Sequence, residues 1–439
     1  MEHASDGQLV RGLRRWDLVA LVINSIMGAG IFGLPSQAFA IAGPYSVLAY
    51  IASAIAILFI VLCFAEVGSR FMATGGPYLY AHTTLGPLVG FQVGWLLWLG
   101  RVAASASLAN LFVGYVSYFI PGAALPQWRA VLIAALIAAL AAANITGIRL
   151  AASVTNVLTV GKLIPLFLFV LVGAWSVERG PFLNMTPLSY GSFSKAALLL
   201  VFTYMGFEGA TIPSGEMRDP QRHLPFALLT GFGVVVFVYV AVQIVCIGTL
   251  PDLAHSQRPL ADASLRFLGR PGASLIAAGA LVSMSGTLNA LMFATPRLLF
   301  AMGENRQLPQ LFSETHSHFR TPAVAICLTA AVTLGLALFS TFISALTISA
   351  IVRIAAYAIT CTALPVLRRR GKIAPATFVA PVGRVIVGGA VALSAWLLSN
   401  SPRNEMRLCG IAIVLGFGLY YGCARPLQKR LTVPEAVGS

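Results

Sequence analysis

Long runs of apolar residues, separated by short polar stretches, follow one another along almost the whole chain. A helix that crosses a membrane needs about 20 apolar residues, and most of these runs are long enough for one such helix. Charged residues, Pro and Gly mark the ends of the predicted helices, which lie near residues 16–42, 45–67, 85–119, 128–146, 153–177, 195–216, 225–250, 273–302, 322–339, 342–367, 382–398 and 406–423. The sequence therefore predicts an all-α polytopic membrane protein with about 12 transmembrane helices.

The connections between these helices are short. The longest, residues 251–272 and 303–321, leave no room for a folded domain outside the membrane. Composition agrees, because 58% of the 439 residues are apolar and only 10% are charged, with a mean hydropathy of +0.85. A soluble chain carries about 25% charged residues, so an ordinary soluble enzyme is excluded and the function must lie within the helical bundle.

Basic residues outnumber acidic ones by 29 to 14, which gives a formal net charge of +15. They concentrate on the side of the predicted bundle that holds both termini, as in Arg368-Arg369-Arg370. Cytoplasmic loops carry the excess of Lys and Arg, so we expect a multi-pass protein of the cell membrane, embedded in lipid bilayer, with both termini cytoplasmic. The basic residues are scattered over many short loops without an aromatic groove, which argues against a nucleic-acid partner.

Small residues interrupt the first and sixth predicted helices near their middle. The interruptions are Met27-Gly28-Ala29-Gly30 and Met205-Gly206-Phe207-Glu208-Gly209, and Pro35 and Pro213 follow them at similar distances. Gly-interrupted helices at matching positions in two halves indicate an inverted-repeat transporter whose site lies at mid-membrane. The alternative is that these glycines only allow close helix packing.

This pattern also predicts the domain organisation. A cytoplasmic N-terminal tail at 1–15 precedes a first repeat at 16–180, which holds helices 1 to 5. The second repeat, at 181–370, holds helices 6 to 10, and 371–439 holds helices 11 and 12 with a cytoplasmic tail. We expect helices 1 and 6 to be unwound at their glycines.

An interrupted helix leaves backbone N–H and C=O groups without partners, which a membrane tolerates only where they line a cavity. The N–H groups of Ala29, Gly30 and Ile31 are expected to bind a carboxylate, and the carbonyls of Ile26, Phe202 and Met205 to accept from an ammonium group. A zwitterionic α-amino acid carries both groups on one carbon. The predicted substrate site comprises Ile26, Met27, Gly28, Ala29, Gly30, Phe202, Met205 and Gly206.

Apolar and aromatic side chains surround the predicted site, among them Met27, Phe202 and Phe207, which favours a substrate with a neutral side chain. Phe32, Trp98 and Phe202 are candidate aromatic gates, with core packing as the alternative role for each. The six cysteines lie in or at the ends of apolar segments without CxxC spacing. We therefore expect no metal site and no cofactor.

Several stretches together resemble an amino acid permease of the amino acid-polyamine-organocation (APC) superfamily. They are Gly28-Ala29-Gly30-Ile31-Phe32, Gly75-Gly76-Pro77-Tyr78, Gly206-Phe207-Glu208, Glu216-Met217-Arg218-Asp219-Pro220 and the segment from Arg297 to Pro309. Each stretch is short, but their order and spacing are specific, and the resemblance covers nearly the whole chain. It implies a five-plus-five inverted repeat (a leucine-transporter-like fold), an amino acid substrate and alternating access.

The resemblance also carries expectations for single residues. Ala29 and Gly30 would bind the substrate carboxylate, and Ile26, Phe202 and Met205 would receive its ammonium group. Arginine-exchanging relatives have tryptophan where this chain has Phe202, which weakens a cationic-substrate interpretation. The stretch 119–128 lacks the cysteine with which light-chain relatives bond a heavy subunit, so no disulfide-linked partner is expected.

Lys162, Glu208, Arg101 and Arg353 lie well inside predicted helices, away from their ends, where a charge is costly and usually functional. Lys162 is expected either to carry a proton or to serve as a fixed cation, and the resemblance places it at helix-one carbonyls beside a helix-eight hydroxyl, for which Ser283 and Ser285 are candidates. Glu208 is expected either to couple protonation to gating or to bond backbone groups that the helix break frees. The partners of Arg101 and Arg353 cannot be assigned from sequence.

The sequence thus predicts a secondary active transporter that moves neutral L-amino acids by alternating access, coupled to protons or by exchange. A cationic amino acid or polyamine exchanger is the alternative within transporters, and a non-transporting amino acid sensor is the alternative outside them. An intramembrane enzyme is not expected, because the chain has no HExxH or GxSxG motif and no paired intramembrane carboxylates.

Overall fold

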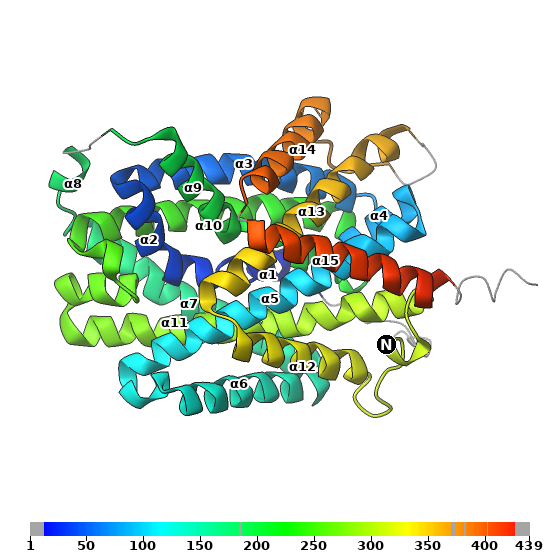
Figure 1. The fold of residues 1–439 in the computed structure, drawn as a ribbon, viewed down its shortest axis with the longest axis horizontal. Coiled ribbons are helices and arrows are strands. Elements are labelled where there is room, and N and C mark those ends of the chain that lie inside the picture. Colours follow the sequence, from blue (N-terminus) through cyan, green and yellow to red (C-terminus); the bar gives the residue numbers. More distant parts are fainter. Residues whose placement is uncertain are drawn as a thin grey trace, which may run out of the picture.

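The structure, a computed structural model, describes residues 13–146, 148–183, 187–369, 375–381, 383–401 and 403–425. Within these residues the regular structure is helical, apart from one isolated bridge between Leu13 and Met217. Most of the long helices run roughly parallel or antiparallel to one another in an elongated bundle (Figure 1). Most of each predicted terminal tail lies outside the described residues.

The described helices are α1 (Arg15–Ile26), α2 (Ala29–Ala42), α3 (Ser46–Gly68), α4 (Pro77–Leu85), α5 (Pro87–Phe119), α6 (Pro126–Thr146), α7 (Ile148–Ala174), α8 (Gly180–Leu183), α9 (Tyr190–Val201), α10 (Pro220–Thr249), α11 (Pro259–Glu304), α12 (Ala323–Phe339), α13 (Phe342–Arg369), α14 (Gly383–Ser399) and α15 (Arg403–Leu419). Three short 3₁₀ segments follow α9: η3 (Phe202–Tyr204), η4 (Phe207–Thr211) and η5 (Ser214–Glu216). In Figure 1, α6 and α12 lie side by side at one edge of the bundle and α14 lies at the opposite edge.

Seven helical segments of the described part are long and apolar enough to cross a membrane: Gly30–Gly68, Pro87–Phe119, Pro126–Thr146, Pro220–Thr249, Pro259–Glu304, Phe342–Arg369 and Met406–Cys423. Three shorter apolar helices accompany them, Gly161–Ala174, Ala323–Phe339 and Gly383–Ser399. Outward faces are apolar as well, since Leu48, Ile51 and Ile55 recur at helical spacing on α3 and are exposed. A helix with an apolar exposed face needs lipid around it, so the chain is a polytopic membrane protein.

Two helical segments begin earlier than hydropathy predicts. α4 precedes the third predicted crossing because Gly76, at φ 53°, turns the chain and Pro77 starts the helix, where its missing N–H costs nothing. α11 starts at Pro259 rather than near residue 273, and Gly269, at φ 65°, separates its first part from the crossing. Short polar helices of this kind carry no strong apolar period, so hydropathy assigned their residues to loops.

Both glycine-containing segments interrupt their helices. α1 ends at Ile26 and α2 begins at Ala29, with Met27 at ψ 81° and Gly28 at φ −122°, ψ −123° between them. α9 ends at Val201, continues as η3, and then turns at Met205 (ψ 155°) and Gly206 (φ 123°) into η4. The α-helical part of the sixth predicted helix is therefore shorter than predicted, because the part after Gly206 is 3₁₀ rather than α-helical.

The two interruptions lie against each other. A Cβ atom built on Gly206 would lie 2.2 Å from the carbonyl oxygen of Ser25, and one built on Gly30 would lie 2.6 Å from Cγ2 of Thr203. Neither separation is possible for real atoms, so only glycine allows the two backbones to approach this closely. α10 and α11 pack against α1, and α5 packs against α11 and α13, which encloses the contact in the bundle.

Replacing Gly206 by alanine should lower the free energy of unfolding by more than about 1 kcal/mol, because its positive φ strains an L side chain and the Cβ meets a backbone oxygen. Thermal unfolding of the purified protein in detergent measures the loss. Gly233→Ala on α10 is the matched control: an added Cβ meets nothing within 4 Å, so its melting temperature should stay equal or rise slightly. Equal melting temperatures for wild type and Gly206→Ala would contradict the close backbone contact.

Candidate functional site

A small cavity lies between the two interrupted helices. The interruptions and their flanks contribute Ser25, Ile26, Gly28, Gly30, Phe202, Thr203 and Met205, while α5, α11 and α13 contribute Ala104, Leu108, Thr287, Leu291 and Arg353. Ile26, Gly28, Gly30, Phe202 and Met205 were all predicted to bind substrate. Of the remaining predicted residues, Met27 and Gly206 adjoin lining residues in the chain without lining the cavity themselves, and the surroundings of Ala29 lie outside the described part of the structure.

Protein donors already occupy part of the predicted ammonium site. The Ile26 carbonyl accepts from the Tyr239 hydroxyl at 3.1 Å and from the Gly28 N–H at 2.9 Å, so both of its lone pairs are used. The Phe202 carbonyl accepts one bond, from the Met205 N–H at 3.1 Å. An ammonium group in the cavity is therefore better served by the carbonyls of Phe202 and Met205 than by that of Ile26.

Lys162 from α7 reaches the carbonyl end of α1. Its Nζ atom donates to the carbonyl oxygens of Asn24, at 3.3 Å, and Met27, at 3.0 Å, and the side chain is fully buried. The carbonyl end of a helix carries partial negative charge, so the ammonium group of Lys162 stabilises the end that the interruption exposes. This is the position that the family resemblance implied for Lys162.

The helix-eight hydroxyl at these carbonyls belongs to Thr287, not to Ser283 or Ser285 as predicted. Thr287 Oγ1 lies 3.1 Å from the Asn24 oxygen and 3.0 Å from the Met27 oxygen, so α11 and α7 hold the same two carbonyls. Ser283 lies one turn earlier on the same face of α11, and its hydroxyl is buried without a hydrogen-bond partner. The face was predictable from the 3.6-residue period, but the turn that meets α1 depends on packing.

The three predicted gating aromatics do not share one location. Phe202 lines the cavity. Phe32 is buried beyond the interruption, where its ring packs edge-on against Tyr115, with 5.9 Å between ring centroids. Trp98 donates its indole N–H to Thr329 on α12 at 3.1 Å, because it lies on a different face of α5 from the cavity-lining residues.

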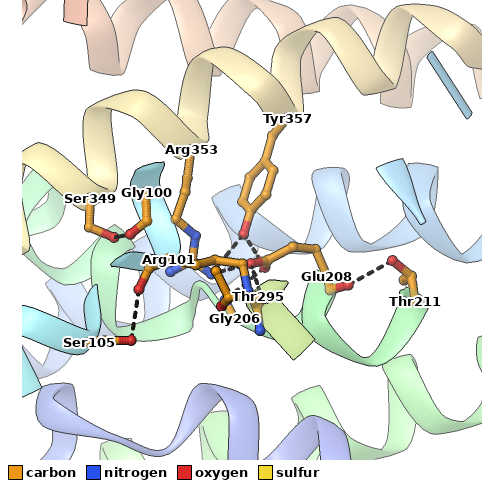
Figure 2. Close-up of polar contacts among 10 residues, drawn as sticks. All are labelled: Gly100, Arg101, Ser105, Gly206, Glu208, Thr211, Thr295, Ser349, Arg353 and Tyr357. Carbon is orange, nitrogen blue, oxygen red and sulfur yellow. Dashed lines mark hydrogen bonds and ion pairs between the residues drawn. The ribbon is translucent and has the colours of Figure 1, made fainter. Parts of the chain in front are cut away.

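A buried charged cluster surrounds Glu208 at the start of η4 (Figure 2). One carboxylate oxygen accepts from Arg101 Nη1 at 3.0 Å and from Arg353 Nη2 at 2.5 Å, and the other accepts from the Tyr357 hydroxyl and, at 3.1 Å, from the Gly206 N–H. These contacts give Arg101 and Arg353 the partner that sequence could not assign. Glu208 thus bonds a backbone N–H group that the interruption frees, which was one of the two roles expected for it.

Two glycines make room for the two arginines. A Cβ on Gly100 would lie 2.5 Å from Cγ of Arg353, and a Cβ on Gly209 would lie 2.9 Å from Nη1 of Arg101. The stem of Arg353 and the guanidinium group of Arg101 therefore each lie over a position where a larger residue would displace them. Gly100 directly precedes Arg101, and Gly209 directly follows Glu208. A glycine next to each of these two charged residues was a local sign of close packing that the sequence analysis did not use.

A second buried carboxylate, Glu66, lies near the C-terminal end of α3. It accepts two bonds from Arg368 at the end of α13, at 2.8 and 2.5 Å, one from Arg70 at 3.2 Å and one from the Ala380 N–H at 2.8 Å. This cluster ties α3 to α13 and to the segment that precedes α14. It differs from the Glu208 cluster in that its arginines are partly exposed.

Comparison with known proteins identifies the class of protein to which the chain belongs. The family model for amino acid permeases matches residues 13–417, which is nearly the whole chain. The chain belongs to this amino acid permease family, as the sequence motifs predicted, and it is a transporter rather than an enzyme.

Three relatives from Bacillus subtilis (strain 168) align over almost their full length. A methylthioribose transporter is 29% identical, with 94% of this chain and 93% of the relative covered. The serine/threonine exchanger SteT is 28% identical, covering 96% and 98%, and the branched-chain amino acid permease BcaP is 26% identical, covering 97% and 96%. The names of these relatives differ in substrate, so similarity alone does not select one.

Replacing Glu208 by glutamine should destabilise the protein by about 3–5 kcal/mol, because it leaves two buried guanidinium groups without a counter-charge. Glu66→Gln is the comparison variant, and it should destabilise the protein less than Glu208→Gln does. Its partners Arg70 and Arg368 are 11% and 32% exposed, whereas Arg101 and Arg353 are only 1% and 3% exposed and cannot be hydrated. Melting temperatures in detergent measure both losses, and a smaller loss for Glu208→Gln would contradict this account of the cluster.

Proposed function

We propose that this protein is a secondary active transporter that moves L-amino acids with neutral side chains across the cell membrane by alternating access. The names of two relatives support an amino acid substrate, since one exchanges serine and threonine and another is a branched-chain amino acid permease. The family membership supports transport, and the geometry of the cavity supports the substrate.

The observation that carries this proposal is which groups bind each of the four half-helix ends at the two interruptions. Lys162 and Thr287 bind the carbonyl end of α1, and the carboxylate of Glu208 binds the Gly206 N–H at the start of η4. The two remaining ends line the cavity, namely the start of α2 at Gly28 and Gly30 and the end of η3 at Phe202 and Met205. One end is positive and the other negative, which matches the carboxylate and ammonium groups of an amino acid.

The proposal includes the transmembrane organisation expected from sequence. The crossing formed by α1 and α2, together with α3, α5, α6 and α7, would make the first five-helix repeat. The crossing formed by α9 and η4, together with α10 to α13, would make the second, with α14 and α15 appended. Interruptions in the first helix of each repeat support this inverted arrangement. Both termini would then be cytoplasmic, in accordance with the excess of basic residues on that side.

The alternative of a cationic substrate is disfavoured by charge. Arg353 lines the cavity, and the carboxylate nearest to it, Glu208, already pairs with two guanidinium groups. A substrate with a cationic side chain would therefore meet a like charge in a site of low dielectric. Lys162 occupies carbonyls that would otherwise suit a cation, which also argues against coupling to sodium.

Proteoliposome uptake tests the proposal and separates its two forms of coupling. Purified protein should take up labelled neutral amino acids, and Lys162→Ala should abolish any stimulation by an inward proton gradient if Lys162 carries the proton. Uptake that requires internal amino acid and ignores pH would make the protein an exchanger in which Lys162 is a fixed cation. Lys195→Ala, at an exposed lysine on α9, is the matched control and should behave as wild type.

Absence of uptake for every amino acid would contradict the proposal. Binding of amino acids without uptake, measured by thermal stabilisation of the same preparation, would indicate the sensor alternative instead. The two outcomes are distinguishable because binding needs only the cavity, whereas transport needs the cavity to open on both sides.

A further inference from the structure

The cavity wall contains one charged side chain among its lining residues, that of Arg353. Three hydroxyls belong to lining residues: Thr203 donates to the Leu200 carbonyl, Thr287 donates to carbonyls of the first interruption, and Ser25 lies at the end of α1 rather than on the wall formed by α5, α11 and α13. Arg353 is therefore the charged hydrogen-bond donor of the wall formed by α5, α11 and α13.

Arg353 makes its hydrogen bonds from a single nitrogen. Nη2 donates to Glu208 at 2.5 Å and lies 3.2 Å from the Tyr357 hydroxyl (Figure 2), while the buried Nε–H has no acceptor. A buried donor without a partner is costly, and native proteins rarely leave one without a reason. The guanidinium cannot easily turn away, because Glu208 and Tyr357 fix one end and Gly100 supports its stem.

The cluster also carries more positive than negative charge. Arg101 and Arg353 share the single carboxylate of Glu208, and all three side chains are almost completely buried. Arg101 has a further acceptor in Thr295, 3.1 Å from its Nε, which leaves Arg353 as the arginine with an unused Nε–H. An oxygen atom supplied by the bound substrate would provide the missing acceptor and offset part of the charge.

The part of the substrate that supplies this oxygen follows from the proposed binding mode. The carboxylate and ammonium groups would occupy the ends of α2 and η3, so the side chain is left with the wall formed by α5, α11 and α13. Ala104, Leu108 and Leu291 make this wall apolar apart from Thr287, whose hydroxyl is engaged, and Arg353. The wall thus suits a small side chain that is mostly apolar and carries one hydrogen-bond acceptor.

We propose that Arg353 binds an oxygen atom in the substrate side chain, so that among neutral amino acids the protein prefers those with a hydroxyl or amide oxygen over aliphatic ones. This inference rests on the proposed amino acid transport and specifies its substrate class. An aliphatic side chain of the same size would leave the Nε–H buried and unpaired, whereas a side-chain oxygen would accept from it.

Threonine and valine are the probes, because they have nearly the same shape and differ by a hydroxyl in place of a methyl group. The ratio of kcat/KM for threonine to that for valine, from uptake into proteoliposomes, should be on the order of tenfold or more in wild type. Arg353→Lys keeps the positive charge but removes Nε and the planar guanidinium. The ratio should fall to about one in this variant.

Arg368→Lys is the matched control. It also removes a guanidinium–carboxylate contact, with the buried Glu66, and Arg368 is not among the residues that line the cavity, so the threonine-to-valine ratio should remain that of wild type. Where Arg353→Lys fails to fold, Arg353→Gln provides a second variant, and thermal stabilisation of the wild-type protein by threonine but not by valine tests the preference without any substitution.

A wild-type ratio near one, or an unchanged ratio in a folded Arg353 variant, would overturn the role of Arg353 while leaving amino acid transport intact. Failure to transport or bind either amino acid, or any other, would instead overturn the proposed function itself. The two failures are therefore separated by the same set of measurements.

Discussion

The contact between two interrupted backbones is the constraint on which the rest of the structure depends. Gly206 lies so close to the Ser25 carbonyl that no side chain fits between them, and this contact requires both helices to be open at the same depth. In a membrane, each group freed in this way must find a partner within the protein. Lys162, Thr287, Tyr239 and Glu208 are those partners, and all four side chains come from outside α1 and α2.

The buried charges around Glu208 are explained by the contact between the two interruptions, because ion pairing alone would not account for them. A buried ion pair gives little net stability, because desolvation offsets the attraction, so the three charges around Glu208 need another explanation. Glu208 bonds the backbone at Gly206 and simultaneously joins η4 to α5 and α13. The glycines beneath the arginines, Gly100 and Gly209, indicate that the surrounding helices are shaped to admit these side chains.

Sequence reasoning succeeded where the signal is local and failed where it is not. Hydropathy located the long apolar helices of the described part, and the glycine segments located both interruptions, because composition and glycine content are properties of single stretches. Arg101 and Arg353 lie 107 and 145 residues from Glu208, and no periodicity links residues so far apart. Thr287 was missed for a related reason: Ser283 and Thr287 share a helix face, and only packing decides which turn contacts α1.

The signs of the capping charges agree with the zwitterionic substrate that we propose for the cavity. A cation binds the carbonyl end of α1 and an anion binds the N–H end at η4, so each charge opposes the partial charge of the end that it covers. The uncovered ends therefore face the cavity with opposite signs. Lys162 lies on α7 and the arginines lie on α5 and α13. Any movement of α1 or η4 relative to these helices must therefore weaken the bonds of Lys162 to α1 or those of the arginines to Glu208. Loss of the Lys162 charge would leave its hydrogen bonds possible but would remove their ionic component, and so would loosen α1 selectively.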